Sequence, residues 1–538
     1  MNRLSFWRIL PFAVLIIFTA PILIVLSSLL GSYSENWFHL YEFVLLDYVS
    51  SSLFLIGGVS LLVLLIGTIT AWTVTTYNFV GKRIFEWALI LPLSIPPYIL
   101  AYTFTGLFDP FGDLNNLFRA LFNLEDTTIV FPNVRNIYGG IIVFAFTLYP
   151  YVYLVSRSAF INQSKSMKEA ARMLGLNQVQ VFYQLALPLI RPAAIGGMML
   201  VVMETLSDFG AVDHFAIQTF TTGIFRTWYG LYDLQTAMQL ASLLLLTIGV
   251  FYIIERNSRG KEIYTSANST FSPSQEEDLT GLKSLIAFLI CFIPIFVGFI
   301  LPITELLIWA YEVNLDFFDK KFLSTSFNTF SLAIASGFIC AVLALIINFS
   351  IRYKPSDLIK KLSGLLSLGY AVPGLILAIG IVQLLIYLDN HILSNLDIVI
   401  TGSIFGLVLS YLIKTYALAN SSIEAGYERV SRSIDDSARM LGSVSWGMLI
   451  NVHLPLMKTA FLTSVLLVMS DVVKELPATL ILRPFNFETL AVSTYIYASE
   501  ERMLQAASPA IAIVLVGLIP IFFLSKMIRS SQPLQDNE

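Results

Sequence analysis

The chain alternates long apolar runs with short polar loops. Runs long enough to cross about 30 Å of hydrocarbon as helices fall into two groups of six. The first six lie near 10–30, 53–74, 87–107, 138–156, 193–214 and 236–254. The second six lie near 284–308, 328–350, 362–388, 398–419, 459–482 and 506–527. This pattern predicts an all-α polytopic membrane protein with about 12 transmembrane helices, arranged as two homologous six-helix halves.

A polar stretch at 255–283 separates the two groups. Its serine, asparagine, glycine and charged residues are typical of a flexible linker without a core of its own. We therefore expect a first transmembrane half at 1–254, a cytoplasmic linker at 255–283 and a second transmembrane half at 284–538. The first apolar run follows Arg3 and Arg8 and could be read as a signal peptide, but it is too long and has no evident cleavage site.

Composition agrees with a membrane protein. Of the 538 residues, 56% are hydrophobic and 13% are charged, against about 25% charged in soluble proteins, and the mean hydropathy is +0.76. Cys291 and Cys340 both fall inside apolar runs, so we interpret them as buried hydrophobic residues and not as a disulfide or metal pair.

Lysine and arginine are distributed unequally between the two sides. If the N-terminus lies inside, the inner loops hold 24 of these residues, including five at 414–458, while the outer loops hold seven and Lys474 falls within a span. The positive-inside rule therefore predicts a cytoplasmic location for both termini and the linker.

One polar segment occurs twice. Lys168–Pro188 aligns at an offset of 267 with a second copy, and the distance from glycine to proline is 13 residues in both. Each copy predicts a helix stopped by a glycine in the left-handed conformation, then a second helix that ends before proline. The charge count places both copies, near 165–192 and 432–459, on the cytoplasmic side.

Motifs for catalysis are missing from the sequence. There is no GxxxxGK[ST] phosphate loop and no GxSxG nucleophile motif, and the four histidines show no metal-ligand spacing. We therefore expect that the chain does not bind ATP itself, is not an enzyme on its own and holds no firmly assigned metal. No nucleic-acid partner is expected, whereas membrane lipids are.

Four carboxylates fall inside apolar runs. Glu204 and Asp208 match Asp471 and Glu475 at the offset of 267, and each pair is spaced i,i+4, so both acids would share one helix face. Charges at that depth usually face a cavity or a partner. We expect a substrate pathway that suits a hard cation, because such ions prefer oxygen ligands. The alternative is neutralisation by Lys474 and nearby polar groups as interhelical contacts.

Prolines suggest hinges in the third span of each half. Pro96 and Pro97 have a counterpart in Pro373 and Gly374, and proline breaks the hydrogen-bond ladder of a helix. A gate hinge and a static kink are equally compatible with this pattern. Further matches at the same offset, including Thr222 with Thr489, predict paired external gate segments at 219–230 and 485–497.

The repeated segment resembles the EAA loop of ABC importer permeases, in which a short coupling helix docks on an ATP-binding subunit. This resemblance implies a type I permease-like fold. The positions that it assigns to coupling are Glu169, Ala170, Ala171, Gly175, Asp436, Ser437, Ala438 and Gly442. The second copy departs from the family pattern, with Asp436 for Glu and Ser437 for Ala. Two loops in one chain imply two ATPase subunits, with ATP and Mg bound there and no cofactor bound by this chain.

Shorter stretches resemble the ferric-iron type of fused permease over essentially the whole chain. They include ETLSDFGAVD at 204–213, TFTTGIFRTWYG at 219–230, PPYILAY at 96–102 and KELPATLILRP at 474–484. This resemblance implies a bacterial inner-membrane subunit that takes up Fe(III) from a periplasmic ferric-binding protein. Permeases for thiamine or an aminoalkylphosphonate share the architecture and remain an alternative. An ion-driven secondary transporter is an alternative of a different class.

Overall fold

The computed structural model describes residues 3–125, 128–161, 163, 171, 173–259, 277–313, 319–353, 363–396 and 398–530. Nearly all of this part is helical. The described strands are β1 (Tyr77–Asn78) and β2 (Glu277–Asp278), which pair in parallel and join the first half to the end of the expected linker. Residues 260–276 of that linker lie outside the described residues.

The first half contains α1 (Arg3–Ser27), η1 (Ser28–Leu30), α2 (Glu35–Phe43), α3 (Leu45–Thr76), α4 (Lys82–Ala88), η2 (Leu91–Ser94), α5 (Pro97–Phe108), α6 (Asp113–Phe122), α7 (Ile137–Ile161), α9 (Gln178–Val181), η3 (Phe182–Ala186), α10 (Leu187–Ser207), α11 (Gly210–His214), α12 (Phe220–Tyr229) and α13 (Leu234–Arg259).

The second half contains α14 (Gly281–Ile295), η4 (Phe296–Ile300), α15 (Leu301–Glu312), α16 (Lys320–Tyr353), η5 (Ser367–Ala371), α18 (Gly374–His391), η6 (Ser394–Leu396), α19 (Ile404–Glu428), α20 (Arg432–Met440), α21 (Trp446–Met448), η7 (Leu449–His453), α22 (Leu454–Val473), α23 (Pro477–Leu482), α24 (Leu490–Ser499) and α25 (Met503–Ser530).

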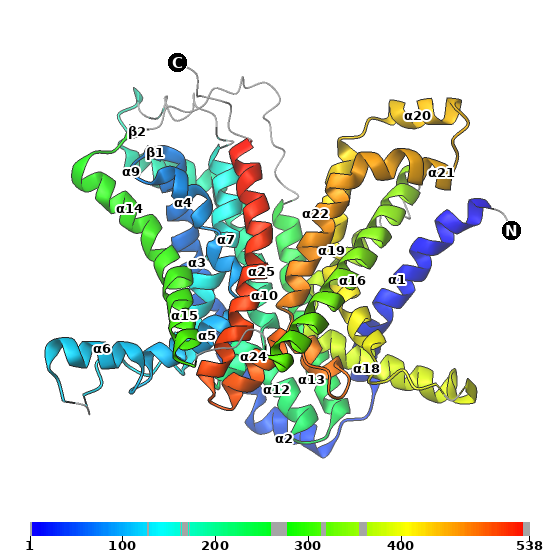
Figure 1. Ribbon diagram of the computed structural model, residues 1–538, viewed down its shortest axis with the longest axis horizontal. Coiled ribbons are helices and arrows are strands. Elements are labelled where there is room, and N and C mark those ends of the chain that lie inside the picture. Colours follow the sequence, from blue (N-terminus) through cyan, green and yellow to red (C-terminus); the bar gives the residue numbers. More distant parts are fainter. Residues whose placement is uncertain are drawn as a thin grey trace.

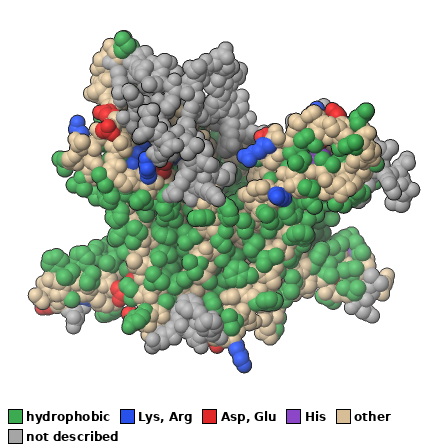
Figure 2. All heavy atoms as spheres, turned by 45° about the horizontal axis from the view of Figure 1, so that its top comes forward, with side chains coloured by type: hydrophobic (Ala, Val, Ile, Leu, Met, Phe, Trp, Pro, Cys, Tyr) green, Lys and Arg blue, Asp and Glu red, His purple; other side chains and the backbone are tan. Residues whose placement is uncertain are grey.

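The spans confirm the predicted count. Within the described residues, 11 helices are long and apolar enough to cross a membrane, or 12 if the bent pair Lys82–Ser94 and Pro97–Phe122 forms one span. The long helices run side by side, α20 lies at one end of the bundle, and α6 projects sideways at the other end (Figure 1). Figure 2 shows a broad hydrophobic surface along the bundle between these ends, as a membrane-spanning body requires.

The first helix of each half crosses to the other half. α1 packs against α18 and α16 of the second half, while α14 and α15 pack against α3 and α5 of the first. The Trp7 ring lies 4.9 Å from the Phe349 ring, and the Trp7 indole N–H donates to the Ser445 hydroxyl at 2.9 Å. The two halves are therefore interlocked by their outermost helices.

The prediction that the repeated segment contains a helix ending before proline was wrong. Pro188 and Pro455 each stand in the first turn of a long helix, α10 and α22, and the chain enters both helices through a π-helical turn, η3 or η7. A π-helical turn carries one extra residue, so the helix can accommodate the missing proline N–H and continue. The two turns match at the offset of 267.

The predicted pairing of the outer segments was wrong by three residues. Thr219 caps the N-terminus of α12, and the equivalent cap of α24 is Thr489, an offset of 270. Thr222 lies inside its helix, whereas Thr489 precedes its own. The identities at offset 267 therefore do not reflect equivalent positions in this part of the structure.

Candidate functional site

Two long helices end where the four intramembrane carboxylates lie. α10 ends at Ser207 and α22 ends at Val473, so Glu204 and Asp471 occupy the last turn of their helices. Asp208 and Glu475 follow the helix ends. The prediction that each pair shares one face of an uninterrupted helix was therefore wrong.

The second acid of each pair holds the start of a short helix. The Asp208 carboxylate accepts the Ala211 N–H at 2.8 Å at the start of α11. The Glu475 carboxylate accepts the Ala478 N–H at 3.3 Å at the start of α23. Each acid accepts a hydrogen bond from a backbone N–H that the start of a helix leaves unpaired. This favours a new helix after the acid, and so the end of the preceding helix before it.

Two lysines enter the same region. Lys414 of α19 donates to Glu475, and the Lys474 ammonium lies 3.1 Å from the Asp471 carboxylate. Glu204 instead accepts a hydrogen bond of 3.1 Å from the Tyr370 hydroxyl. The neutralisation considered as the alternative thus operates in the second half, with Lys414 as an additional partner.

These side chains line one cavity of about 100 Å³. All four predicted pathway acids contribute to its wall, together with Lys414 and Lys474. Carboxylates outnumber lysines by two, so the wall carries excess negative charge when all six groups are ionised. Within the described residues, no group of three or more His, Cys, Asp or Glu side chains is arranged to hold a metal ion.

The predicted hinge positions also border this region. Pro96 and Pro97 line the cavity at the start of α5, and the chain bends by 90° between Ser94 and Pro97. Pro373 caps α18, and a Cβ added to the next residue, Gly374, would lie 2.3 Å from Glu475 Oε1. A methyl group at this position would therefore displace the Glu475 carboxylate. Whether these breaks move as hinges stays a prediction.

The second repeated loop has the local structure that its sequence predicts. α20 is followed by Gly442 with φ of +81°, and the Ser443 N–H donates to the Ala438 carbonyl at 2.9 Å. In the first loop, Gly175 has φ of +84° and the Leu176 N–H donates to the Ala171 carbonyl at 3.2 Å. Both glycines occupy the left-handed position of a helix C-terminus. Glu169 and Ala170 lie outside the described residues.

Burial divides the loop residues into two sets. Ala171 and Ala438 are both 7% exposed, so each loop packs its alanine against the bundle. The methionine and leucine before each glycine are instead 83–90% exposed: Met173, Leu174, Met440 and Leu441. Asp436 and Ser437 are also exposed. The described part of each loop thus exposes large apolar side chains, a feature that is common at interaction surfaces.

Residues 63–257 match the family model described as the binding-protein-dependent transport system inner membrane component. The match covers about a third of the chain, and this part of the chain is similar to the membrane components of such transport systems. The chain is also 26% identical over 488 residues to the Fe(3+)-transport system permease protein FbpB 2 of Haemophilus influenzae, covering 89% of this chain and 90% of the relative.

Two further relatives are also named as permease proteins of transport systems. The ferric transport system permease protein FbpB of Actinobacillus pleuropneumoniae is 24% identical over 444 residues, 77% of this chain and 61% of the relative. The sulfate transport system permease protein CysT of Salmonella typhimurium is 30% identical over 146 residues, 27% of this chain and 50% of the relative.

Sequence reasoning missed three contributors to the site. Lys414 was counted among the loop lysines, but it lies within α19 and pairs with Glu475, so the inner-loop count falls by one. A lysine inside an apolar run was the available signal. Tyr151 and Tyr370 gave none, because tyrosines are common throughout this chain.

Proposed function

We propose that this permease is the membrane subunit of an ATP-driven importer that moves Fe(III) across the inner membrane. The observation that carries the proposal is the cavity, in which two carboxylates from each half meet. Fe(III) is a hard cation, and carboxylate oxygens suit such cations. The names of the two ferric relatives support this choice of cargo.

The two repeated loops would each receive one ATPase subunit. The exposed apolar side chains at 173–174 and 440–441 support docking, since large apolar groups gain most from burial against a partner. The coupling residues would be Glu169, Ala170, Ala171 and Gly175 in the first loop and Asp436, Ser437, Ala438 and Gly442 in the second. ATP and Mg would bind only on those subunits.

The cytoplasmic side would be the end that carries both loops, and both chain termini would lie there. A periplasmic binding protein would deliver Fe(III) at the opposite end. Closure of the ATPase subunits would open the cavity outward, and hydrolysis would return it inward. The breaks at Pro96–Pro97 and Pro373–Gly374 are where the spans would bend.

The test is uptake by the permease reconstituted with its ATPase and candidate binding proteins, with Fe(III), thiamine and a phosphonate compared. We expect ATP-dependent uptake of Fe(III) alone. Transport by the isolated chain in a sodium or proton gradient would reject the importer, and uptake of thiamine or phosphonate would reject the cargo.

A double variant tests the cavity acids. Glu204→Gln with Asp471→Asn keeps the shapes of both side chains but removes their charges, and we expect at least tenfold slower Fe(III) uptake, or about 1.4 kcal/mol. Copurification of the ATPase subunits should not change. Labelled Fe(III) uptake at the parental rate would assign these acids to structure.

A further inference from the structure

The coupling helix of the second loop is fastened to the membrane domain by one buried charge pair. Asp435 lies in the first turn of α20, and its side chain is 6% exposed. Arg352, one residue before the end of α16, donates from Nε to Asp435 Oδ2 at 2.6 Å and from Nη2 to Oδ1 at 3.2 Å. Such two-point pairing fixes orientation as well as distance.

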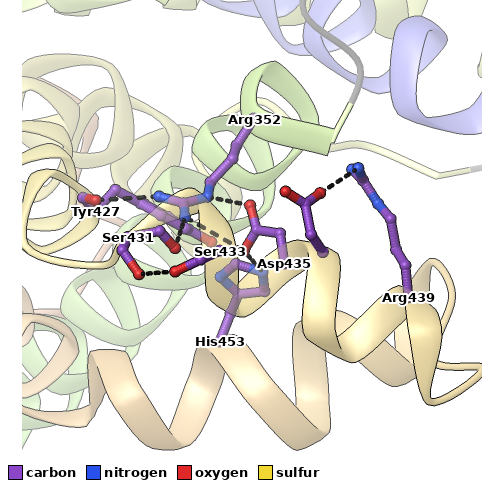
Figure 3. Close-up of polar contacts among 8 residues, drawn as sticks. Arg352, Tyr427, Ser431, Ser433, Asp435, Arg439 and His453 are labelled. Carbon is purple, nitrogen blue, oxygen red and sulfur yellow. Dashed lines mark hydrogen bonds and ion pairs between the residues drawn. The ribbon is translucent and has the colours of Figure 1, made fainter.

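The same guanidinium holds two backbone carbonyls (Figure 3). Arg352 donates from Nη1 to the Tyr427 carbonyl at 3.1 Å and from Nη2 to the Ser431 carbonyl at 2.9 Å. Tyr427 belongs to the last turn of α19, and Ser431 precedes α20. One side chain of α16 therefore connects the ends of two further helices, and lysine could not reproduce this planar set of donors.

A histidine completes the cluster from a third side. His453 Nε2 lies 3.4 Å from Asp435 Oδ1, and the His453 side chain is 1% exposed. His453 ends the π-helical turn η7, directly before α22. Asp471 lies farther along α22, about 27 Å from His453 at 1.5 Å per residue. α20 is thus in contact with the helix that carries a cavity acid.

The neighbouring acid faces the other way. The Asp436 side chain is 72% exposed, and among the described residues it pairs with Arg439 at 3.4 Å, also on the surface. Successive residues of a helix point about 100° apart, so Asp435 faces the bundle while Asp436 faces the space in which an ATPase would dock. Asp435 therefore attaches α20 to the bundle, and Asp436 remains available for contact with the ATPase.

α16 continues from the cluster to the opposite end of the bundle. Its 34 residues span about 50 Å as a straight helix. At that far end, Thr329 accepts the Leu490 N–H at 2.9 Å, and the Asn328 amide donates to the Glu488 carbonyl at 3.2 Å. Leu490 is the first residue of α24, so α16 connects the coupling helix to α24 at the opposite end of the bundle.

We propose that Arg352, Asp435 and His453 pass motion of the second coupling helix to α16 and α22. This inference rests on the proposed function. At the offset of 267, the sequence of the first half has Lys168 in place of Asp435 and Ala186 in place of His453. The two loops therefore differ in sequence at these positions, and the second moves α24 through its rigid connection to α16.

The experiment measures three quantities in the reconstituted complex: retention of ATPase subunits, ATP hydrolysis and Fe(III) uptake. Asp435→Asn and Arg352→Gln should each retain the ATPase and hydrolyse ATP within about twofold of the parent, while uptake per ATP falls at least tenfold. The double variant should be no worse than either single variant, because paired residues act as a unit. Asp435→Glu, which keeps the charge, should recover part of the coupling.

Glu500→Gln is the matched control, since it removes a carboxylate from an exposed pair with Arg502; uptake per ATP should stay at the parental value. Unchanged uptake per ATP in both single variants would overturn the proposal. Loss of ATPase retention would also overturn it, because the cluster would then only fold the loop. A parent complex that binds no ATPase would instead reject the proposed function.

Discussion

At the scale of single residues, Gly374 lies directly against the carboxylate of a cavity acid, Glu475. A methyl group there would meet Glu475 Oε1 at 2.3 Å. That carboxylate is already held by Lys414 and by the Ala478 N–H, so it cannot simply turn away. Overpacking at such a site typically costs about 1–3 kcal/mol.

We therefore expect Gly374→Ala to slow Fe(III) uptake about tenfold by displacing a cavity acid. The measurement is initial uptake rate in proteoliposomes, with expression level and ATPase copurification as checks on folding. Gly364→Ala is the matched control, because a Cβ at that position meets no atom within 4 Å. Equal rates for the two variants would show that the approach of Gly374 to Glu475 has no functional consequence.

The same residues show what the sequence could and could not predict. The offset of 267 found all four acids, because a repeated intramembrane carboxylate is rare and conspicuous. It did not find that Asp208 and Glu475 lie past the ends of their helices. That geometry depends on backbone donors at Ala211 and Ala478, which become available only when a new helix starts.

At the scale of elements, helix positions were predictable and helix ends were not. Spans follow from apolar length, which any bilayer imposes. The two π-helical turns, η3 and η7, carry the chain past Pro188 and Pro455, and no residue type announces such a turn. The helix stop at Gly442 was predictable, since a left-handed residue after a polar helix favours glycine.

Gly442 gives a test at this scale. Its φ is +81°, and a Cβ there meets nothing within 4 Å, so any penalty is in the backbone alone. Gly442→Val should redirect the chain after α20 and reduce uptake per ATP at least fivefold, since β-branched residues rarely adopt this conformation. Gly442→Asn should preserve coupling, because asparagine tolerates it. Coupling retained in the valine variant would show that the stop is not needed.

At the scale of the whole molecule, the exchange of outer helices makes the halves mutually dependent. Trp7 of α1 packs 4.8 Å from Trp446, beside the second loop, and the α1 backbone passes close enough to Gly380 of α18 that a Cβ there would lie 2.4 Å from the Pro21 carbonyl oxygen. The sequence predicted two six-helix halves but not this exchange. Nothing in an apolar run specifies which neighbour it packs against.

A divided chain tests this dependence. We expect residues 1–259 and 277–538, produced together, to copurify and to take up Fe(III) within about threefold of the intact chain, because contacts and not the linker hold the halves. Either half produced alone should accumulate poorly, since the first would expose the inner face of α1 and the second would lack the helix that covers α18.

The measurements are detergent gel filtration of each product and uptake by the reconstituted pair. A monodisperse single half would contradict the dependence, and a pair that never associates would assign the linker a structural role. Removal of 1–30 from the first fragment tests the share of α1: this deletion should weaken copurification of the two fragments, with the contacts of α14 and α15 on the first half left in place.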